Sequence, residues 1–97
     1  MTAATLTELS VTDFPGTVQS GTGVRRRMVF VRITDPSAET LDLSSYVPGA
    51  VDVEGIVYET DDGVVSGTAA TWSTYTLTFG TGVNGAYEGC FVIRTTV

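Results

Sequence analysis

Residues 51–59 read Val-Asp-Val-Glu-Gly-Ile-Val-Tyr-Glu. The apolar residues Val51, Val53 and Val57 are separated by even spacings, and acidic residues fill the alternate positions at the start of the stretch. A repeat of two residues is typical of a β-strand with one buried face. The stretch therefore predicts a strand whose valines point into a core while its carboxylates face water.

The sequence after this stretch continues the same sheet. Asp61 to Gly63 predicts a tight turn, because Gly adopts positive φ without strain and Asp tolerates it. The two valines that follow are expected to begin a return strand. Residues 75–79 then alternate between large apolar side chains and threonine, which predicts a further strand. We expect residues 51–79 to form a hairpin and a third strand at the centre of an all-β domain.

Two other stretches are apolar on both faces. In residues 28–33, β-branched side chains share one face, while Met28 and Phe30 share the other with an arginine. Residues 87–97 also alternate with apolar side chains on both sides. A strand of this kind is central in a sandwich or is covered by a partner. The alternation predicts that seven side chains point inward: Val31, Val51, Val53, Val57, Leu77, Phe79 and Val92.

The remaining segments complete a single domain over residues 1–97. Residues 1–13 are expected to form a flexible N-terminal arm or a first strand. Residues 16–23 are a predicted loop, either a plain connection or a subunit contact. Residues 40–47 fit a short strand or one helical turn. Six to seven short, mainly antiparallel strands between Gly and Pro turns predict a small all-β fold, either a β-sandwich or a β-barrel.

The composition disfavours several classes of partner. The formal net charge of −6 disfavours binding to nucleic acid and to anionic membranes, because both are themselves negative. The single cysteine, Cys90, cannot form an intramolecular disulfide, and we expect it to be a small buried hydrophobic residue. No apolar run approaches the length of a membrane span, and the N-terminus does not resemble a signal peptide. We therefore expect synthesis in a cytoplasm.

Catalytic chemistry has few candidate groups in this sequence. There is no His and no Lys, so acid–base catalysis would fall to carboxylates or Tyr, and a serine nucleophile would lack its usual base. Carboxylates can also cleave glycosides in pairs or bind calcium. We expect those of this chain to lie instead in solvated turns and on wet strand faces: Glu54, Glu59, Asp61, Asp62 and Glu88. The sequence thus predicts no enzyme activity, no cofactor and no metal site.

One glycine motif invites a dinucleotide-binding interpretation. Residues 80–85, Gly-Thr-Gly-Val-Asn-Gly, match the spacing G-x-G-x-x-G, which must be followed by a helix that meets the pyrophosphate. Residues 87–97 follow this motif and are predicted to be a strand. We therefore interpret residues 80–85 as a hairpin loop.

Five residues are candidates for an interface. Arg25, Arg26 and Arg27 are the only cationic cluster of an acidic chain, and a guanidinium binds carboxylates in a bidentate manner. The cluster predicts either a solvated strand entrance or a contact with an acidic neighbour. Trp72 and Tyr75 could stack on sugar rings, but we expect them in the core or at a subunit contact, because aromatic side chains supply much of the buried area of a small domain.

Four segments carry a resemblance to a known class of proteins: Asp42–Val47, Asp52–Glu59, Thr71–Ser73 and Thr76–Phe79. With the short strand that closes the chain, they resemble the small, acidic, Thr-, Val- and Gly-rich β-proteins of tailed-bacteriophage virions, in particular the capsid decoration or cement proteins. The resemblance covers residues 40–97 and is one of style and size, so it assigns no role to individual residues.

The resemblance implies a non-enzymatic structural protein that binds and stabilises a viral shell. The implied partners are the major capsid protein or other virion subunits, and a homo-oligomer, either dimer or trimer. The implied location is the capsid exterior, after synthesis in the host cytoplasm. The sequence leaves three alternatives open, which are a carbohydrate-binding module, a receptor-binding module and a tail or baseplate component.

Overall fold

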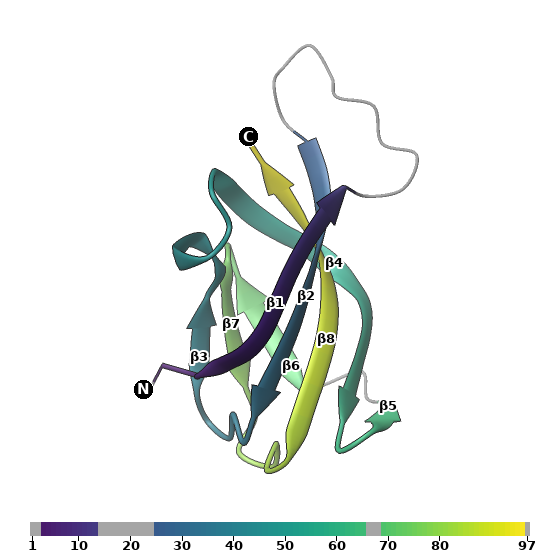
Figure 1. Cartoon of the computed structure of the whole chain (residues 1–97). Coiled ribbons are helices and arrows are strands. Elements are labelled where there is room, and N and C mark those ends of the chain that lie inside the picture. Colours follow the sequence, from purple (N-terminus) through teal and green to yellow (C-terminus); the bar gives the residue numbers. More distant parts are fainter. Residues whose placement is uncertain (1–2, 14–24, 66–68, 97) are drawn as a thin grey trace.

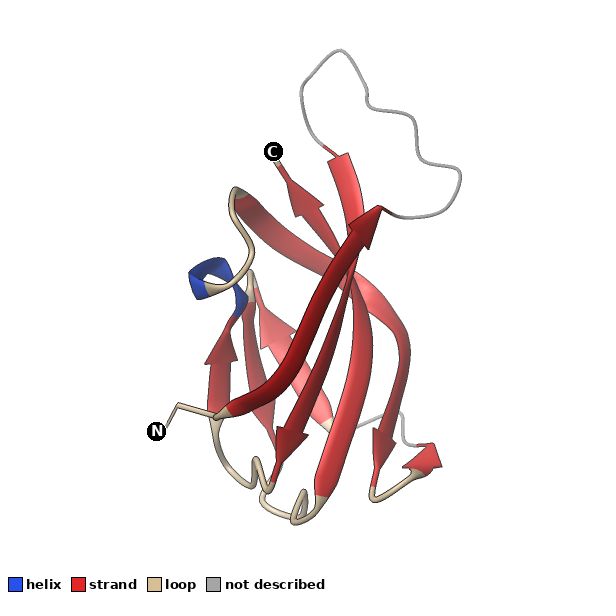
Figure 2. Cartoon of the chain, viewed as in Figure 1, coloured by secondary structure: helices blue, strands red, loops and turns tan. Residues whose placement is uncertain are grey.

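The chain folds into a β-sandwich of two antiparallel sheets, seen in a computed structural model that describes residues 3–13, 25–65 and 69–96. One sheet has five strands in the order β1-β2-β8-β4-β5, and the other has three in the order β3-β7-β6 (Figures 1 and 2). The elements in chain order are β1 (Leu6–Asp13), β2 (Arg25–Thr34), β3 (Thr40–Asp42), the 3₁₀ turn η1 (Leu43–Ser45), β4 (Ala50–Asp61), β5 (Val64–Val65), β6 (Ala70–Ser73), β7 (Thr76–Phe79) and β8 (Ala86–Thr95). The predicted all-β fold is confirmed as a sandwich, and the two sheets do not close into a barrel.

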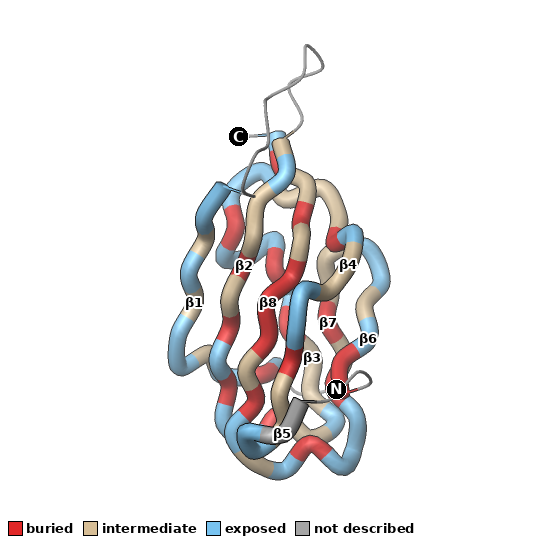
Figure 3. Tube along the Cα trace, turned by 90° about the vertical axis from the view of Figure 1, so that its right-hand side faces the viewer, coloured by how far each residue is buried: buried red, intermediate tan, exposed pale blue. Residues whose placement is uncertain are grey.

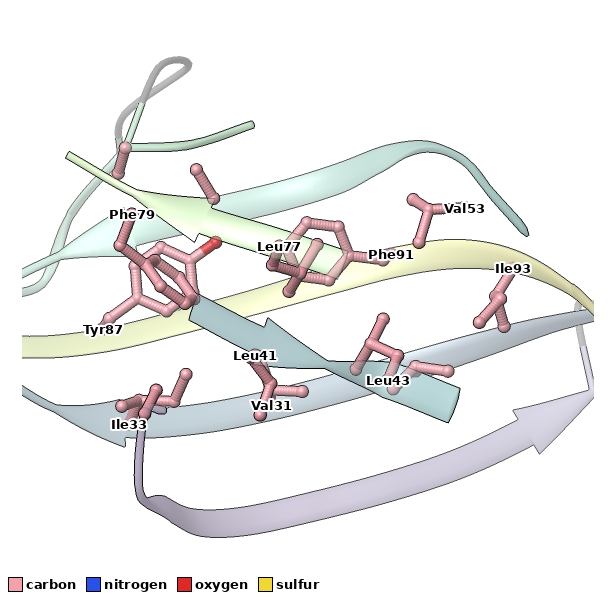
Figure 4. Packing of buried hydrophobic residues seen from close by; sticks show 14 of the residues in the cluster. Val31, Ile33, Leu41, Leu43, Val53, Leu77, Phe79, Tyr87, Phe91 and Ile93 are labelled. Carbon is pink, nitrogen blue, oxygen red and sulfur yellow. The ribbon is translucent and has the colours of Figure 1, made fainter. Parts of the chain in front are cut away.

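The core lies between the two sheets (Figure 4). The five-stranded sheet contributes side chains such as Val31 and Phe91, and the three-stranded sheet contributes Leu77 and Phe79. These four side chains are at most 2% exposed. Fully burying a side chain of this kind stabilises the fold by about 1.5–3 kcal/mol. The two-residue alternation predicted for β2, β7 and β8 therefore matches what the core requires.

The predicted hairpin after residue 60 is present between β4 and β5, but the strand predicted within residues 75–79 is β7 of the other sheet and does not continue this one. Asp61 pairs with Val64, which leaves Asp62 and Gly63 as a two-residue loop. Both loop residues have positive φ, 54° and 80°. This is the requirement of a type I′ turn, the connection whose twist matches that of the flanking strands.

Strand β4 contains three β-bulges, which the sequence pattern did not predict. Its pairing with β8 shifts between Ala50 and Asp52, between Val53 and Gly55, and between Ile56 and Tyr58. Each bulge adds one residue opposite β8 and so reverses the face on which later residues point. The strand therefore places Val53, Ile56 and Glu59 toward the core at a spacing of three residues.

Three of the seven inward predictions are wrong. Val57 is 51% exposed because it is the extra residue of the third bulge. Val51 is the extra residue of the first bulge, and it is half-buried outside the core cluster. Val92 lies opposite Met28 on the other face of β8, because both faces of this strand are apolar and the sequence did not show which one is covered.

The two ambiguous segments are resolved by tertiary pairing. Leu6–Asp13 forms edge strand β1 against β2, and Ala3 bridges Thr40 just before it. Residues 40–47 contain both predicted elements, because strand β3 runs directly into the turn η1. The carboxylate of Asp42 caps this turn by accepting the Ser44 N–H at 2.9 Å. The predicted loop at residues 16–23 lies outside the described residues.

Over the described parts of the chain, the structure has no helix with the length and apolar character needed to cross a membrane.

Candidate binding face

The five-stranded sheet has an outer face that points away from the three-stranded sheet, and apolar side chains run across its middle. We call these residues the outer stripe: Met28, Phe30, Tyr58, Cys90 and Val92, together with the exposed bulge residue Val57 next to Tyr58. Strand register brings them together, since Cys90 pairs with Phe30 on one side and with Tyr58 on the other. Figure 3 shows how buried and half-buried positions follow one another along β2.

The outer stripe is unequally exposed. Tyr58 is 41% exposed, and Val57 beside it is also open to solvent. Cys90, at the centre of the stripe, is only 8% exposed. Burial raises the pKa of the Cys90 thiol, and burial is also the main reason that the pKa of Tyr58 is raised. Both groups are therefore neutral at pH 7, and the stripe carries no charge of its own.

Ion pairs border one end of the stripe. Arg32 on β2 contacts Glu8 on β1 at 2.8 Å and Glu88 on β8 at 3.1 Å. Its guanidinium carbon also lies 5.7 Å from the centre of the Phe30 ring. This distance permits a cation–π contact, which links the charged border to the apolar stripe.

A second set of ion pairs borders the opposite end. Arg94 on β8 binds both carboxylate oxygens of Asp52 on β4, at 2.8 and 2.7 Å. Arg26 on β2 contacts Glu54 at 2.6 Å. The hydrogen bonds from Arg94 hold the pKa of the Asp52 carboxyl below its ordinary value. The outer face as a whole carries three arginines and four carboxylates, so it has only −1 of the chain's formal charge of −6.

The predicted arginine cluster is divided between two surroundings. Arg25 and Arg27 both contact Asp13 at the end of β1, at 2.8 and 3.3 Å. Arg26 points to the other side of the strand, where Glu54 binds it. Alternation along β2 separates the three side chains, and all three already bind carboxylates of their own chain. A contact between this cluster and another protein remains a prediction.

The two aromatic candidates lie toward the core rather than on an open surface. Trp72 is half-buried and meets the Phe91 ring edge-on, with ring centres 6.1 Å apart. Tyr75 is also half-buried and packs against the core cluster. The structure therefore brings neither of them next to Arg25–Arg27 as a single site, and it places both at the packing between the sheets.

One carboxylate is buried, contrary to the prediction of a solvated position. Glu59 is 1% exposed because the bulges of β4 turn it inward. It accepts hydrogen bonds from the Tyr87 hydroxyl at 2.7 Å and from the Ala69 backbone N–H at 2.8 Å. Burial, and then the bond to Glu59, raise the pKa of Tyr87 far above its ordinary value. The Glu59–Tyr87 pair is closed to solvent and serves packing. The two-residue alternation of the sequence gives no sign that Glu59 is buried.

The other carboxylates near this hairpin do not form a metal centre. Asp62 Oδ1 accepts the Ala86 N–H at 3.1 Å, so it braces the hairpin against the start of β8. No group of three or more His, Cys, Asp or Glu side chains within residues 3–13, 25–65 and 69–96 is arranged to hold a metal ion.

The glycine motif at residues 80–85 connects β7 to β8, and therefore joins the two sheets. A strand and not a helix follows it, as predicted, but the interpretation as a hairpin loop is wrong, because β7 and β8 lie in different sheets and do not pair. Val83 in this loop is buried, so the loop is part of the packing and lacks the helix that a pyrophosphate site requires.

Comparison with protein families, curated proteins and solved structures finds no match to this chain.

Proposed function

We propose that this chain is a non-enzymatic structural protein of a virion, specifically a capsid decoration protein that binds and stabilises the shell. The observation that carries the proposal is the outer stripe, a band of apolar side chains on the outside of a small acidic domain. Apolar side chains that are bordered by polar ones are typical of protein–protein contact surfaces. The resemblance of residues 40–97 to small virion β-proteins supplies the setting.

The geometry favours protein partners over carbohydrate. A sugar-binding platform needs an aromatic ring whose flat face is open to the ligand. Trp72 is instead half-buried and packs against the core cluster. Tyr58 is exposed, but it lies among aliphatic and sulfur-containing side chains on a sheet face. Such a surface matches the apolar centre of a protein interface, where Tyr, Phe and Met are enriched.

The test is to add the purified chain to shells that lack it, and to measure binding and resistance to heat or osmotic shock. We expect the chain to bind and the shells to rupture at a higher temperature. Shells that neither bind the chain nor gain resistance would refute the proposal. Deletion of residues before Asp13 is unsuitable as a variant, because it removes β1, whose Leu9 and Val11 pack against the core.

The arginine cluster supplies a sharper variant for the same experiment. Replacing Arg25, Arg26 and Arg27 by Ser removes side chains that sit at the strand entrance and bind Asp13 and Glu54. Exposed ion pairs contribute at most about 1 kcal/mol each, so the fold should persist. We expect weaker shell binding, with the largest difference at low salt, where charges are screened least. Equal shell binding by the wild type and the variant across a salt series would show that the cluster does not contact the shell.

A further inference from the structure

The outer stripe has no covering element within the described residues, because the three-stranded sheet packs on the opposite face of the five-stranded sheet (Figure 1). We infer that a second copy of the chain covers it, in a two-fold dimer whose outer faces pack against each other. This inference rests on the proposed structural role for its biological setting. It deepens that role by assigning the outer stripe to self-association, which leaves contact with the shell to the rest of the dimer surface.

Shape and composition fit a face-to-face contact. Two β-sheets pack about 10 Å apart when the side chains between them interdigitate. The stripe supplies side chains of suitable size on neighbouring strands: Met28 and Phe30 on β2, Val57 and Tyr58 on β4, and Cys90 and Val92 on β8. In a two-fold dimer the same surface serves both copies, so no separate complementary patch is required.

The available area is sufficient for a specific dimer. Strands β2 and β8 have 10 residues each, β4 has 12 and β1 has 8. With a rise of about 3.3 Å per residue and a strand spacing of about 4.8 Å, these four strands offer about 600 Å² of flat surface. Specific interfaces bury about 600–1,000 Å² per partner. The face is thus at the lower end of that range, which suits a reversible dimer.

Charge favours this face over the rest of the surface. Two copies with a formal charge of −6 each repel one another at long range. The outer face holds only −1 of that charge, and the remaining −5 lies on other surfaces and in the core. A second acidic copy can therefore approach the outer face with the least repulsion.

Charge also selects the direction of packing. One end of the face carries Arg26 and Arg94 paired with Glu54 and Asp52, so it is neutral. The other end carries Glu8 and Glu88 around Arg32, so it has a net charge of −1. A two-fold axis across the strands places the −1 end of each copy over the neutral end of its partner, whereas an axis along the strands would place the two −1 ends over each other. Charge therefore favours the antiparallel arrangement.

The dimer is tested by sedimentation of the purified wild-type chain, without any shell, over a concentration series that extends into the millimolar range. We expect a monomer–dimer equilibrium. Val57→Asp places a charge within the stripe at a position that is half exposed in the monomer, so the fold should tolerate it. We expect it to raise the dimer dissociation constant by about tenfold or more, since interface-centre residues dominate affinity.

Two controls make the outcome specific. Thr71→Asp adds the same charge at an exposed position of β6 in the other sheet, and it should leave the dimer unchanged. Val57→Lys tests whether the loss of apolar burial or the added negative charge weakens the dimer. It lowers the negative charge of the chain, yet it should still disrupt the dimer because it places a charge in the apolar stripe. Circular dichroism confirms that each variant is folded. Methyl resonances of Met28 and Val92 should shift with concentration in the wild type and in Thr71→Asp, and not in the two Val57 variants.

Three results would overturn the inference. The chain could stay monomeric at every concentration, or Val57→Asp and Thr71→Asp could weaken association equally. Alternatively, concentration-dependent protection of backbone amides could appear along β1 alone, which would indicate pairing between edge strands. A monomer that still binds shells refutes the dimer and leaves the proposed function intact. A dimer that binds no shell refutes only the proposed function.

Discussion

Strands β2 and β4 flank β8 on its two sides, yet only β2 keeps the alternation of its sequence. All ten residues of β2 pair with β8 in unbroken register, so Val29, Val31 and Ile33 are fully buried. Along β4 the register shifts three times, and the inward positions are three residues apart. The comparison shows that the sequence pattern describes a strand's faces only while its pairing remains regular.

The bulges of β4 also give its backbone and side chains partners outside its own sheet. The Val53 N–H donates to the Thr74 carbonyl at 2.7 Å, and Glu59 accepts the Ala69 N–H. Both contacts join β4 to the segment that carries the three-stranded sheet. Bulges bend and twist a strand, which allows β4 to reach this neighbouring layer. By contrast, β2 lies between β1 and β8, where pairing with both neighbours satisfies its backbone hydrogen bonds.

The largest expected effect is at Glu59, where the bulged strand departs furthest from its pattern. Glu59→Ala leaves the Tyr87 hydroxyl and the Ala69 N–H buried without their acceptor. Each unsatisfied buried polar group costs about 1–3 kcal/mol, so for the two groups we expect a loss of about 2–6 kcal/mol in the free energy of unfolding. Urea denaturation measures it.

Two substitutions control for the chemistry of Glu59. Glu59→Gln should cost less than Glu59→Ala, because its amide oxygen accepts the Ala69 N–H while its NH₂ group donates to the Tyr87 oxygen. Glu54→Ala tests an exposed acidic position of the same strand, and it should change stability little. Similar losses at Glu54 and Glu59 would contradict the inward turn of β4.

An intermediate effect comes from one substitution made in both strands. Val31→Ala removes a fully buried side chain from the regular strand β2, and we expect it to cost about 2 kcal/mol through lost burial and the cavity left behind. Val57→Ala removes the same atoms from an exposed bulge of β4, and we expect a change within about 0.5 kcal/mol. Thermal unfolding of dilute protein measures both. Equal costs would mean that Val57 is buried in the monomer.

The smallest effect is the acid sensitivity of the ion pair between Asp52 and Arg94. Folding lowers the pKa of the Asp52 carboxyl from its ordinary value of 3.8, chiefly through hydrogen bonds from Arg94. Its contribution is therefore fully present above about pH 4, and it is lost as the pH falls through the lowered pKa. The stability difference between wild type and Asp52→Asn should shrink below pH 4. A difference that stays constant down to pH 2 would contradict the ion pair.

Much of the fold could be predicted from local sequence. Alternation identified the strands around Val31, Leu77 and Phe91, and the Asp–Gly pair identified the hairpin between β4 and β5. These features depend on the residues themselves, on their preference for a pleated surface or for positive φ. Less of the candidate site could be predicted. The apolar character of Met28 and Phe30 was visible, but their grouping with Val57 was not.

The sequence by itself therefore determined an acidic all-β domain with two strands apolar on both faces. Tertiary structure alone decided which face of β8 the second sheet covers, where β4 bulges, and that Glu59 is buried while Val57 is exposed. The physical reason is that a bulge and a covered face are properties of pairing and packing between distant segments. No residue near position 57 carries that information, because the residues that set its register lie on β8, more than thirty positions away.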